Sequence, residues 1–245
     1  MITCSIRTSA YSLVFRVEDT KAFAHFIAAT RIFAGPGNQE GSHIMEIFNT
    51  LAFLVFPYIA LTIFIVGHAY RYATDRYDWN AKSNQLLDTE TLKYGVSIFH
   101  WGIILTFLGH AGGLLIPQRL YDAVGISGRM HTAIAIYAGF VVGVAVFIGL
   151  LMMVFRRLSR RRLSATTSGK DYFLLAFLFL VSGIGLYNVA FGHYYVLDTV
   201  APWIRSILIL NPKPELMIPV PLSYKLHILT AFALLAYSPF TRLVH

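Results

Sequence analysis

Long runs of apolar residues, separated by short polar segments, dominate the chain after residue 44. A helix that crosses a membrane needs about 20 mostly apolar residues, and five stretches reach this length. They are roughly residues 47–68, 94–116, 132–155, 172–191 and 222–241 or beyond. The runs are continuous, whereas the strands of a membrane β-barrel alternate between apolar and polar residues. The pattern predicts an all-α membrane protein whose residues 45–245 form a bundle of five transmembrane helices.

Residues 1–44 follow a different pattern. Charged side chains interrupt every apolar run, and Gly-Pro-Gly-Asn at residues 35–38 predicts a turn. The continuous apolar core of a signal peptide is missing. Because Met45 immediately precedes the first span, two interpretations of this N-terminal extension stay open: sequence upstream of the true start, or a short extramembrane arm.

The segment from His193 to Pro221 is the longest connection on its side of the membrane. Its prolines at 202, 212, 214, 219 and 221 predict irregular structure. We expect one short helix within it, near residues 200–210, and expect the segment to cover that end of the bundle.

Composition and charge agree with a membrane location. The chain has 56% hydrophobic residues, 13% charged residues and a mean hydropathy of +0.61, outside the range of soluble domains. The net charge of +8 does not indicate nucleic-acid binding, because most cations lie between the spans. Loops 71–93 and 156–170 are the most basic, so we expect them in the cytoplasm, with the N-terminus outside and the C-terminus inside.

Four histidines on two of the predicted spans carry the candidate chemistry. They are His100 and His110 on the second span, and His227 and His245 on the fifth. A neutral imidazole is a good axial ligand for haem iron, and an ionisable side chain within a span is costly and usually functional. The four histidines therefore predict two haem b groups, each held by two imidazoles.

Depth in the membrane decides which histidines can share an iron. On a helix, His100 and His110 are about 15 Å apart, and His227 and His245 are about 27 Å apart on one face. The two spans run in opposite directions, so the expected pairs are His110 with His227 at the outer side and His100 with His245 at the inner side. The two separations differ by about 12 Å, and we expect a kink at Pro239 and helix tilt to absorb this.

Each histidine alone is more simply explained by a hydrogen bond within the bundle or by a place near the membrane interface. Four at matching depths favour ligation. A metal transporter would usually add carboxylates at these depths, and the five spans contain no Asp or Glu in their interiors.

Several other side chains are secondary candidates. His131 opens the third span near the depth of the outer haem, where it could bond to a quinone oxygen and take a proton. Arg156, Arg157 and Arg242 lie at the inner side, where a guanidinium could bind a haem propionate. Ordinary interfacial placement is the alternative for His131, and orienting charge is the alternative for Arg156 and Arg157.

Over residues 45–245 the chain resembles the gamma subunit, a dihaem cytochrome b, of membrane-bound respiratory nitrate reductase. The most specific motifs are Phe99-His100, Gly109-His110, Leu226-His227 and Pro-Phe-Thr-Arg-Leu-Val-His at 239–245. The sequences Arg-Tyr-Asp-Trp at 76–79, Gln-Leu-Leu-Asp at 85–88 and Ala-Thr-Thr-Ser-Gly at 165–169 support them. The N-terminal extension and an end at His245 depart from the family pattern, and a native chain that continues further would explain the second departure.

The resemblance implies a subunit in the inner (cytoplasmic) membrane that oxidises quinol near the outer face. Electrons would pass through two haem b groups to an iron–sulfur beta subunit, and nitrate reduction itself would occur on a molybdenum alpha subunit. It assigns His110 and His227 to the outer haem, and His100 and His245 to the inner haem. His131 falls near the position of a basic residue in the family's quinol site.

Two alternative functions stay open. One is a related dihaem subunit of a sulfite- or heterodisulfide-reductase-type complex, and the other is a haem-free anchor or transporter. Cys4 is the only cysteine, so an iron–sulfur cluster must belong to a partner.

Overall fold

The computed structural model describes residues 36–75, 90–159, 164 and 167–241. Every regular element among them is a helix, in agreement with the predicted all-α class. The chain divides into a unit of residues 1–47, of which only the first part of helix α2 (Pro36–Thr50) is described, and a unit of residues 48–245. The turn expected at residues 35–38 is wrong, because α2 begins at Pro36. Proline suits a first helical position, since its fixed φ is helical and its missing N–H has no partner there.

Four stretches of the described residues are long and apolar enough to cross a membrane. The first, His43–Thr74, contains most of α2, the π-helical segment η2 (Leu51–Val55) and α3 (Phe56–Asp75). The second stretch, Tyr94–Leu115, contains most of α4 (Glu90–His110) and the π-helical segment η3 (Ala111–Leu115). The third, Gly128–Ser159, is helix α6. The fourth, Gly169–Gly192, contains α8 (Gly169–Tyr187) and the π-helical segment η4 (Asn188–Gly192). The fifth predicted span contains α10 (Leu222–Tyr237), which has 16 residues, so the count of five stays a prediction.

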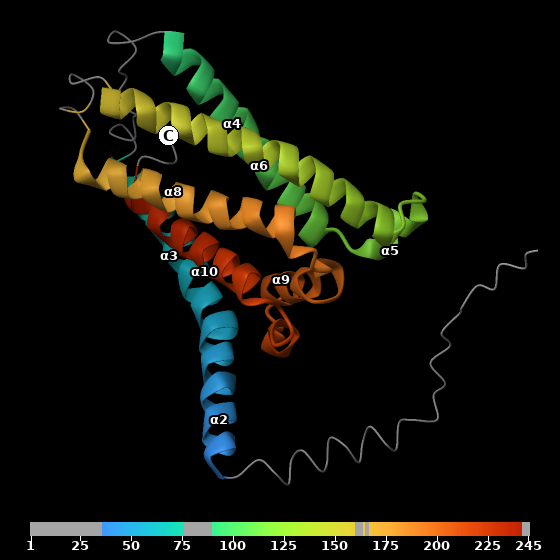
Figure 1. The fold of residues 1–245 in the computed structure, drawn as a ribbon. Coiled ribbons are helices and arrows are strands. Elements are labelled where there is room, and N and C mark those ends of the chain that lie inside the picture. The colour runs from blue at the N-terminus through green and yellow to red at the C-terminus, as the bar shows by residue number, and fades with distance from the viewer. Residues whose placement is uncertain (1–35, 76–89, 160–163, 165–166, 242–245) are drawn as a thin grey trace, which may run out of the picture. The chain divides into compact units, whose positions relative to one another are not determined.

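The helices of the larger unit pack in a row, in the order α4, α6, α8, α10, α3 (Figure 1). The closest approach joins α4 to α6, where a Cβ on Gly149 would lie 2.9 Å from the backbone nitrogen of Phe99. A side chain there would push the two helices apart. α4 and α10 are not among the closely packed pairs of the described helices, although both carry candidate histidines.

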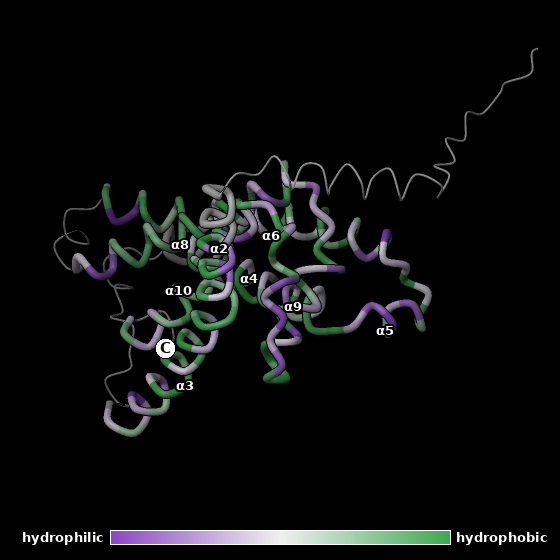
Figure 2. Tube along the Cα trace, turned by 90° about the horizontal axis from the view of Figure 1, so that it is seen from below, coloured by the Kyte–Doolittle hydropathy of each residue, from purple (hydrophilic) through white to green (hydrophobic). Residues whose placement is uncertain are grey.

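Large apolar side chains cover the outside of these helices. Ile65, Phe107, Val141 and Phe155 are each more than 60% exposed. Figure 2 shows hydrophobic residues along most of the helices and more hydrophilic ones near α5 (Gln118–Ala123) and α9 (Val200–Leu208). Such a surface would be unfavourable in water and matches a lipid environment, so the helices have the character of a membrane protein.

The start of α8 has a local explanation in the sequence. The hydroxyl of Ser168 accepts a hydrogen bond from the backbone N–H of Asp171, and the carboxylate of Asp171 accepts one from the backbone N–H of Ser168. This capping box satisfies donors that a helix start leaves free. It fixes the start of α8 at Gly169.

The helix expected over residues 222–241 is interrupted. α10 ends at Tyr237, a 3₁₀ turn, η7, covers Ser238–Phe240, and Thr241 is extended at φ −119° and ψ 179°. Proline at 239 has no N–H to donate and clashes with the preceding turn. The helix is therefore not regular between His227 and Thr241, which is a larger change than the kink expected at Pro239. His245 lies outside the described residues, so its 27 Å separation from His227 stays a prediction.

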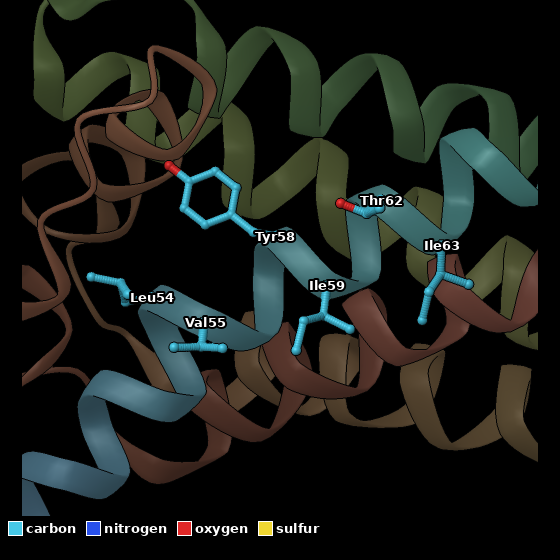
Figure 3. Close-up of a pocket in the computed structure, with 6 residues that line it drawn as sticks. All are labelled: Leu54, Val55, Tyr58, Ile59, Thr62 and Ile63. Carbon is cyan, nitrogen blue, oxygen red and sulfur yellow. The ribbon is translucent and has the colours of Figure 1, made fainter.

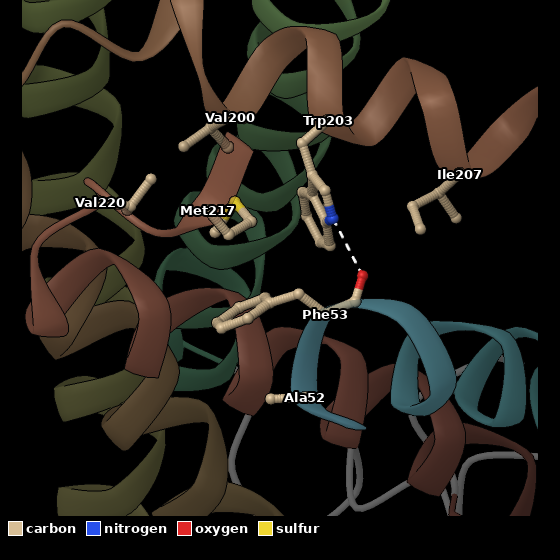
Figure 4. Packing of buried hydrophobic residues seen from close by; sticks show 7 residues of the cluster. All are labelled: Ala52, Phe53, Val200, Trp203, Ile207, Met217 and Val220. Carbon is tan, nitrogen blue, oxygen red and sulfur yellow. Dashed lines mark hydrogen bonds between the residues drawn. The ribbon is translucent and has the colours of Figure 1, made fainter. Parts of the chain in front are cut away.

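One end of the bundle is closed by the connection between α8 and α10. It contains the 3₁₀ turns η5 (Val196–Asp198) and η6 (Pro214–Met217), with α9 between them, so the short helix predicted near residues 200–210 is confirmed. Trp203 of α9 is fully buried against Phe53, and its indole N–H donates to the Phe53 carbonyl at 3.0 Å (Figure 4). Arg205 ties α9 to η3 by donating to the Leu114 carbonyl at 2.9 Å.

Candidate functional site

The structure brings the side chains of His110 and His227 together from α4 and α10. Their ring centroids are 6.2 Å apart and the rings are tilted by 36°. Bonds from a transition-metal ion to an imidazole nitrogen are about 2 Å long, and the ring centre lies roughly 1 Å further away, so two rings on opposite sides of one ion have centroids about 6 Å apart. The observed spacing fits a shared iron.

Hydrogen bonds select which nitrogen of each ring is available. Nδ1 of His110 lies 2.8 Å from the Thr106 carbonyl, and Nδ1 of His227 lies 3.1 Å from the Val181 carbonyl. A carbonyl only accepts, so each Nδ1 must carry the proton and each Nε2 keeps its lone pair. This is the tautomer that a ligating histidine needs, with the second nitrogen held by a carbonyl.

Glycines border the outer pair of histidines. A Cβ on Gly185 of α8 would lie 2.8 Å from Cε1 of His227, so only glycine leaves room for this ring position. A Cβ on Gly109 would meet no atom within 4 Å, and Gly109 directly precedes His110. Gly102 instead faces Val146 of α6, where its missing side chain allows the two helices to pack closely.

The contact between η4 and α10 fixes the helix register beside His227. The hydroxyl of Tyr224 donates to the Asn188 carbonyl at 3.1 Å and accepts from the Tyr194 N–H at 3.3 Å. The Asn188 side chain is buried and donates to the Ser223 carbonyl at 3.3 Å. α10 therefore cannot rotate about its axis without breaking these bonds.

At the inner site, the described residues supply one of the two predicted ligands. Nδ1 of His100 lies 2.9 Å from the Val96 carbonyl, the same arrangement as in His110, so its Nε2 is also available. The partner, His245, and the candidate Arg242 lie outside the described residues. The structure does describe the backbone that leads toward them, up to Thr241.

Arg71 of α3 holds that backbone in place, a contact that sequence reasoning missed. Its guanidinium donates to the carbonyls of Pro239 and Thr241. A Cβ on Gly67 would lie 2.8 Å from Cβ of Pro239, so Gly67 lets the interrupted segment approach α3. The sequence did not indicate this contact, because Arg71 and Pro239 are 168 positions apart.

Arg156 and Arg157 end α6. Arg156 is buried, with 7% of its surface exposed, and Arg157 is partly buried. Burial of a guanidinium is unusual for a residue that only orients a loop. Their contacts with a propionate are not tested by the structure.

His131 is buried at the start of α6, at the end of the bundle where α5 lies. Its ring contacts that of Tyr121, with centroids 4.2 Å apart and the planes tilted by 41°, and Nδ1 lies 2.8 Å from Oε1 of Gln118. Its Nε2 lies 3.8 Å from the place that a Cβ on Gly113 would take, and Gly113 is three residues beyond His110. His131 therefore lies in space beside the segment that follows His110, and its partners are ordered.

Sequence reasoning missed Gln118, Tyr121 and Asp122 as neighbours of His131. Gln118 and Asp122 are four residues apart on a helix, a spacing that brings side chains together, and this was the one available signal. Tyr121 donates to the Gly112 carbonyl at 3.0 Å, which joins α5 to η3.

A shallow groove on α3 is separate from this chemistry. It is lined by Leu54, Val55, Tyr58, Ile59, Thr62 and Ile63 (Figure 3). No histidine, carboxylate or cation is among these residues, so the groove is not the candidate site. Nor do the described residues contain a group of three or more His, Cys, Asp or Glu side chains that could hold a bare metal ion. Two axial imidazoles are all that a haem iron requires of the protein, so the donor set fits haem.

Comparison with known proteins places the chain in a family. A sequence model described as the nitrate reductase gamma subunit matches residues 49–245. The nitrate reductase gamma chain of Bacillus subtilis is 40% identical over 195 residues, which cover 78% of this chain and 87% of that protein. The respiratory nitrate reductase 1 gamma chain of Escherichia coli is 30% identical over 206 residues, 82% of this chain and 91% of that protein.

A longer relative also matches. The nitrate reductase-like protein NarX of Mycobacterium tuberculosis is 33% identical over 234 residues, which cover 93% of this chain but 34% of that protein. With a family match over most of the chain and relatives of similar length, the chain belongs to the nitrate reductase gamma subunit family and is a subunit of that oxidoreductase complex.

Proposed function

We propose that the chain is the membrane-anchoring dihaem cytochrome b subunit of a respiratory nitrate reductase. It oxidises quinol near the outer face and passes electrons through two haem b groups to an iron–sulfur beta subunit. The beta subunit passes them to a molybdenum alpha subunit. The observation that carries the proposal is the pair of imidazoles of His110 and His227, 6.2 Å apart, each with Nδ1 bonded to a carbonyl.

His110 and His227 would hold the outer haem. The carbonyls of Thr106 and Val181 orient the two rings and increase the basicity of each Nε2. Gly185 leaves space for the His227 ring, and the Tyr224 contacts keep α10 in register.

His100 and His245 would hold the inner haem. His100 is oriented by the Val96 carbonyl in the same way as His110. Arg71 fixes the turn that precedes the second ligand, and Arg156, Arg157 and Arg242 are the cations proposed to bind propionates.

His131 is proposed as the residue that accepts a hydrogen bond and then a proton from a quinol hydroxyl. The burial of its ring and its position near Gly113 support this role. An imidazole suits it because its pKa normally lies near neutrality, so the ring can take and release a proton in each turnover.

The proposed orientation in the cytoplasmic membrane follows from the basic loops. Loop 156–170 contains six Lys and Arg residues, and loop 71–93 contains four, so both are placed in the cytoplasm. The same inner surface would bind an acidic face of the iron–sulfur subunit. Quinol would enter from the membrane at the opposite side, near α5 and α9.

The direct test uses membranes that contain the complete complex. Under anaerobic conditions we expect the reduced quinone menadiol to produce the absorption bands of reduced b-type haem. His110→Ala and His227→Ala should each abolish reduction by menadiol but leave one haem reducible by dithionite. His43→Ala, which changes an exposed histidine of α2, is the control. Wild-type membranes without a b-type spectrum would refute the proposal, as would full menadiol reduction in either variant.

A further inference from the structure

A chain of hydrogen bonds leads from the buried His131 to the surface of α5. Nδ1 of His131 is 2.8 Å from Oε1 of Gln118, and Nε2 of Gln118 is 2.8 Å from Oδ1 of Asp122. The same Gln118 nitrogen donates to the carbonyl of Ile126 at 3.0 Å. His131 is 6% exposed, whereas Asp122 is exposed, so the chain joins a buried ring to a solvated carboxylate.

The chemistry of these partners decides the orientation of the Gln118 amide. An ionised carboxylate and a backbone carbonyl can only accept hydrogen bonds, so both must face the amide NH₂ of Gln118. The amide oxygen of Gln118 is then left to face His131. Because that oxygen also only accepts, Nδ1 of His131 must carry the proton, and the bare lone pair must be on Nε2.

We propose that Gln118 and Asp122 are positioning residues of the quinol site, acting through His131. Gln118 holds the ring in the tautomer that presents Nε2 toward Gly113, and the carboxylate of Asp122, through the Gln118 amide, stabilises the imidazolium that forms when His131 accepts a proton. The ligand at Nε2 is a hydroxyl of a hydroquinone. The inference rests on the proposed function, in which quinol is the electron donor.

The proton and electron balance is simple. The O–H bond of the hydroquinone breaks, its proton forms an N–H bond at Nε2, and one electron leaves for the one-electron acceptor of the proposed function. His131 then releases that proton to outer water and is available for the second hydroxyl. One hydroquinone gives one quinone, two protons and two electrons.

Other ionisable groups lie on the elements around His131, and the variants below leave all of them unchanged. Tyr121 contacts the ring in a tilted arrangement, and a Cβ on Gly128 would lie 2.6 Å from the phenol oxygen of Tyr195. The other ionisable groups on α5, at the start of α6, on α9 and near η3 and η5 include Arg119, Arg129, Arg205, His110 and Asp198.

Two variants test the role of the Asp122 carboxylate, and they are expected to shift the pH profile of the rate in opposite directions. The measurement is the rate of menadiol oxidation by the complete complex as a function of pH. On the acid side of this profile the rate falls because His131 becomes protonated, and this fall is called the acid limb. Asp122→Asn removes the charge and should move the limb to lower pH by about half a unit, because the imidazolium loses stabilisation. The double variant Gln118→Glu/Asp122→Asn keeps one carboxylate but places it next to Nδ1, so the limb should move to higher pH by about one unit.

A third variant tests whether Gln118 fixes the tautomer of His131. Gln118→Leu removes the acceptor for Nδ1–H, so kcat should fall at least about 10-fold with little change in KM for menadiol. The double variant Gln118→Glu/Asp122→Asn restores an acceptor and should recover most of that loss at high pH. Glu215→Gln removes a carboxylate from η6 on the same side of the bundle and should leave the profile unchanged.

The outcomes separate this inference from the proposed function. Wild-type complex whose b haem is not reduced by menadiol would overturn both. Normal reduction in the wild type, with Asp122→Asn and the double variant showing no shift or shifts in the same direction, would overturn the positioning role alone. Opposite shifts with unchanged dithionite-reduced spectra are the expected result, and loss of packing alone would not produce them.

Discussion

At the scale of single residues, the three candidate haem ligands that the structure describes share one side-chain arrangement, which His68 also has with the Phe64 carbonyl. His100, His110 and His227 each place Nδ1 within 3.1 Å of a backbone carbonyl, which removes the choice of tautomer before any ligand binds. For His100 and His110 the carbonyl belongs to the residue four positions earlier on α4, so the helix itself orients the ring. For His227 it comes from α8, so its orientation depends on packing between helices.

Gly185 gives a sharp test of that dependence. Gly185→Ala would place a Cβ 2.8 Å from the His227 ring and force it away from Val181 and His110. We expect the menadiol-reducible haem signal to fall by more than half, measured by difference spectroscopy at equal protein amounts. Gly169→Ala is the matched control on the same helix, because a Cβ there meets no atom within 4 Å. Equal signals in both variants would contradict the assigned position of His227.

At the scale of elements, the interruption of α10 at Pro239 matters most. A break at this point replaces a straight helix with a turn held against α3 by Arg71. The position of any ligand that follows is therefore determined by α3 as well as by α10.

Removal of this clamp should affect the inner haem selectively. Arg71→Gln loses a guanidinium that donates to two carbonyls, so we expect a lower haem content with the menadiol-reducible outer signal retained. Redox titration of the b-type absorption would show which component is lost. Lys170→Gln, which removes an exposed cation at the start of α8, is the control. Selective loss of the outer component instead would count against the assignment of Arg71 to the inner site.

α9 is the element that closes one end of the bundle, and Trp203 is its main buried contact. Trp203→Ala should lower the free energy of unfolding by about 3–5 kcal/mol because a fully buried ring is lost. Trp203→Phe keeps most of the apolar area and loses the bond to the Phe53 carbonyl, at a cost of about 1 kcal/mol plus the imperfect fit. Thermal unfolding in detergent measures both values.

Trp101→Ala is the matched control for α9, because Trp101 is 65% exposed on α4. It should change the unfolding temperature little. If Trp101→Ala and Trp203→Ala destabilise the protein equally, Trp203 does not hold α9 against the end of the bundle.

At the scale of the whole molecule, the sequence predicts some features well. Continuous apolar runs locate the helices because length and hydropathy are what a bilayer requires, and proline spacing locates the short α9. The proximity of His110 and His227 also follows from the sequence, since membrane orientation gives each span a direction and each residue a depth.

Other features could not be read from the sequence. The effect of Pro239 was underestimated because a proline within a span either kinks or ends a helix, and tertiary contacts such as the Arg71 bonds decide between these outcomes. The packing of Gly102 against Val146 could not be predicted, because glycine spacing does not reveal which neighbour a small residue accommodates. The Gln118 contact with His131 depends on how α5 folds back over α6, which no periodicity encodes.

The central claim is that two haem groups are held by four histidines of this chain. The most direct measurement is the molar ratio of haem b to this polypeptide in purified complex, from the pyridine haemochrome spectrum and quantitative amino-acid analysis. The account predicts a ratio of two in the wild type and of one in both His100→Ala and His110→Ala. A wild-type ratio of one or zero, or a ratio of two that persists in either variant, would contradict it.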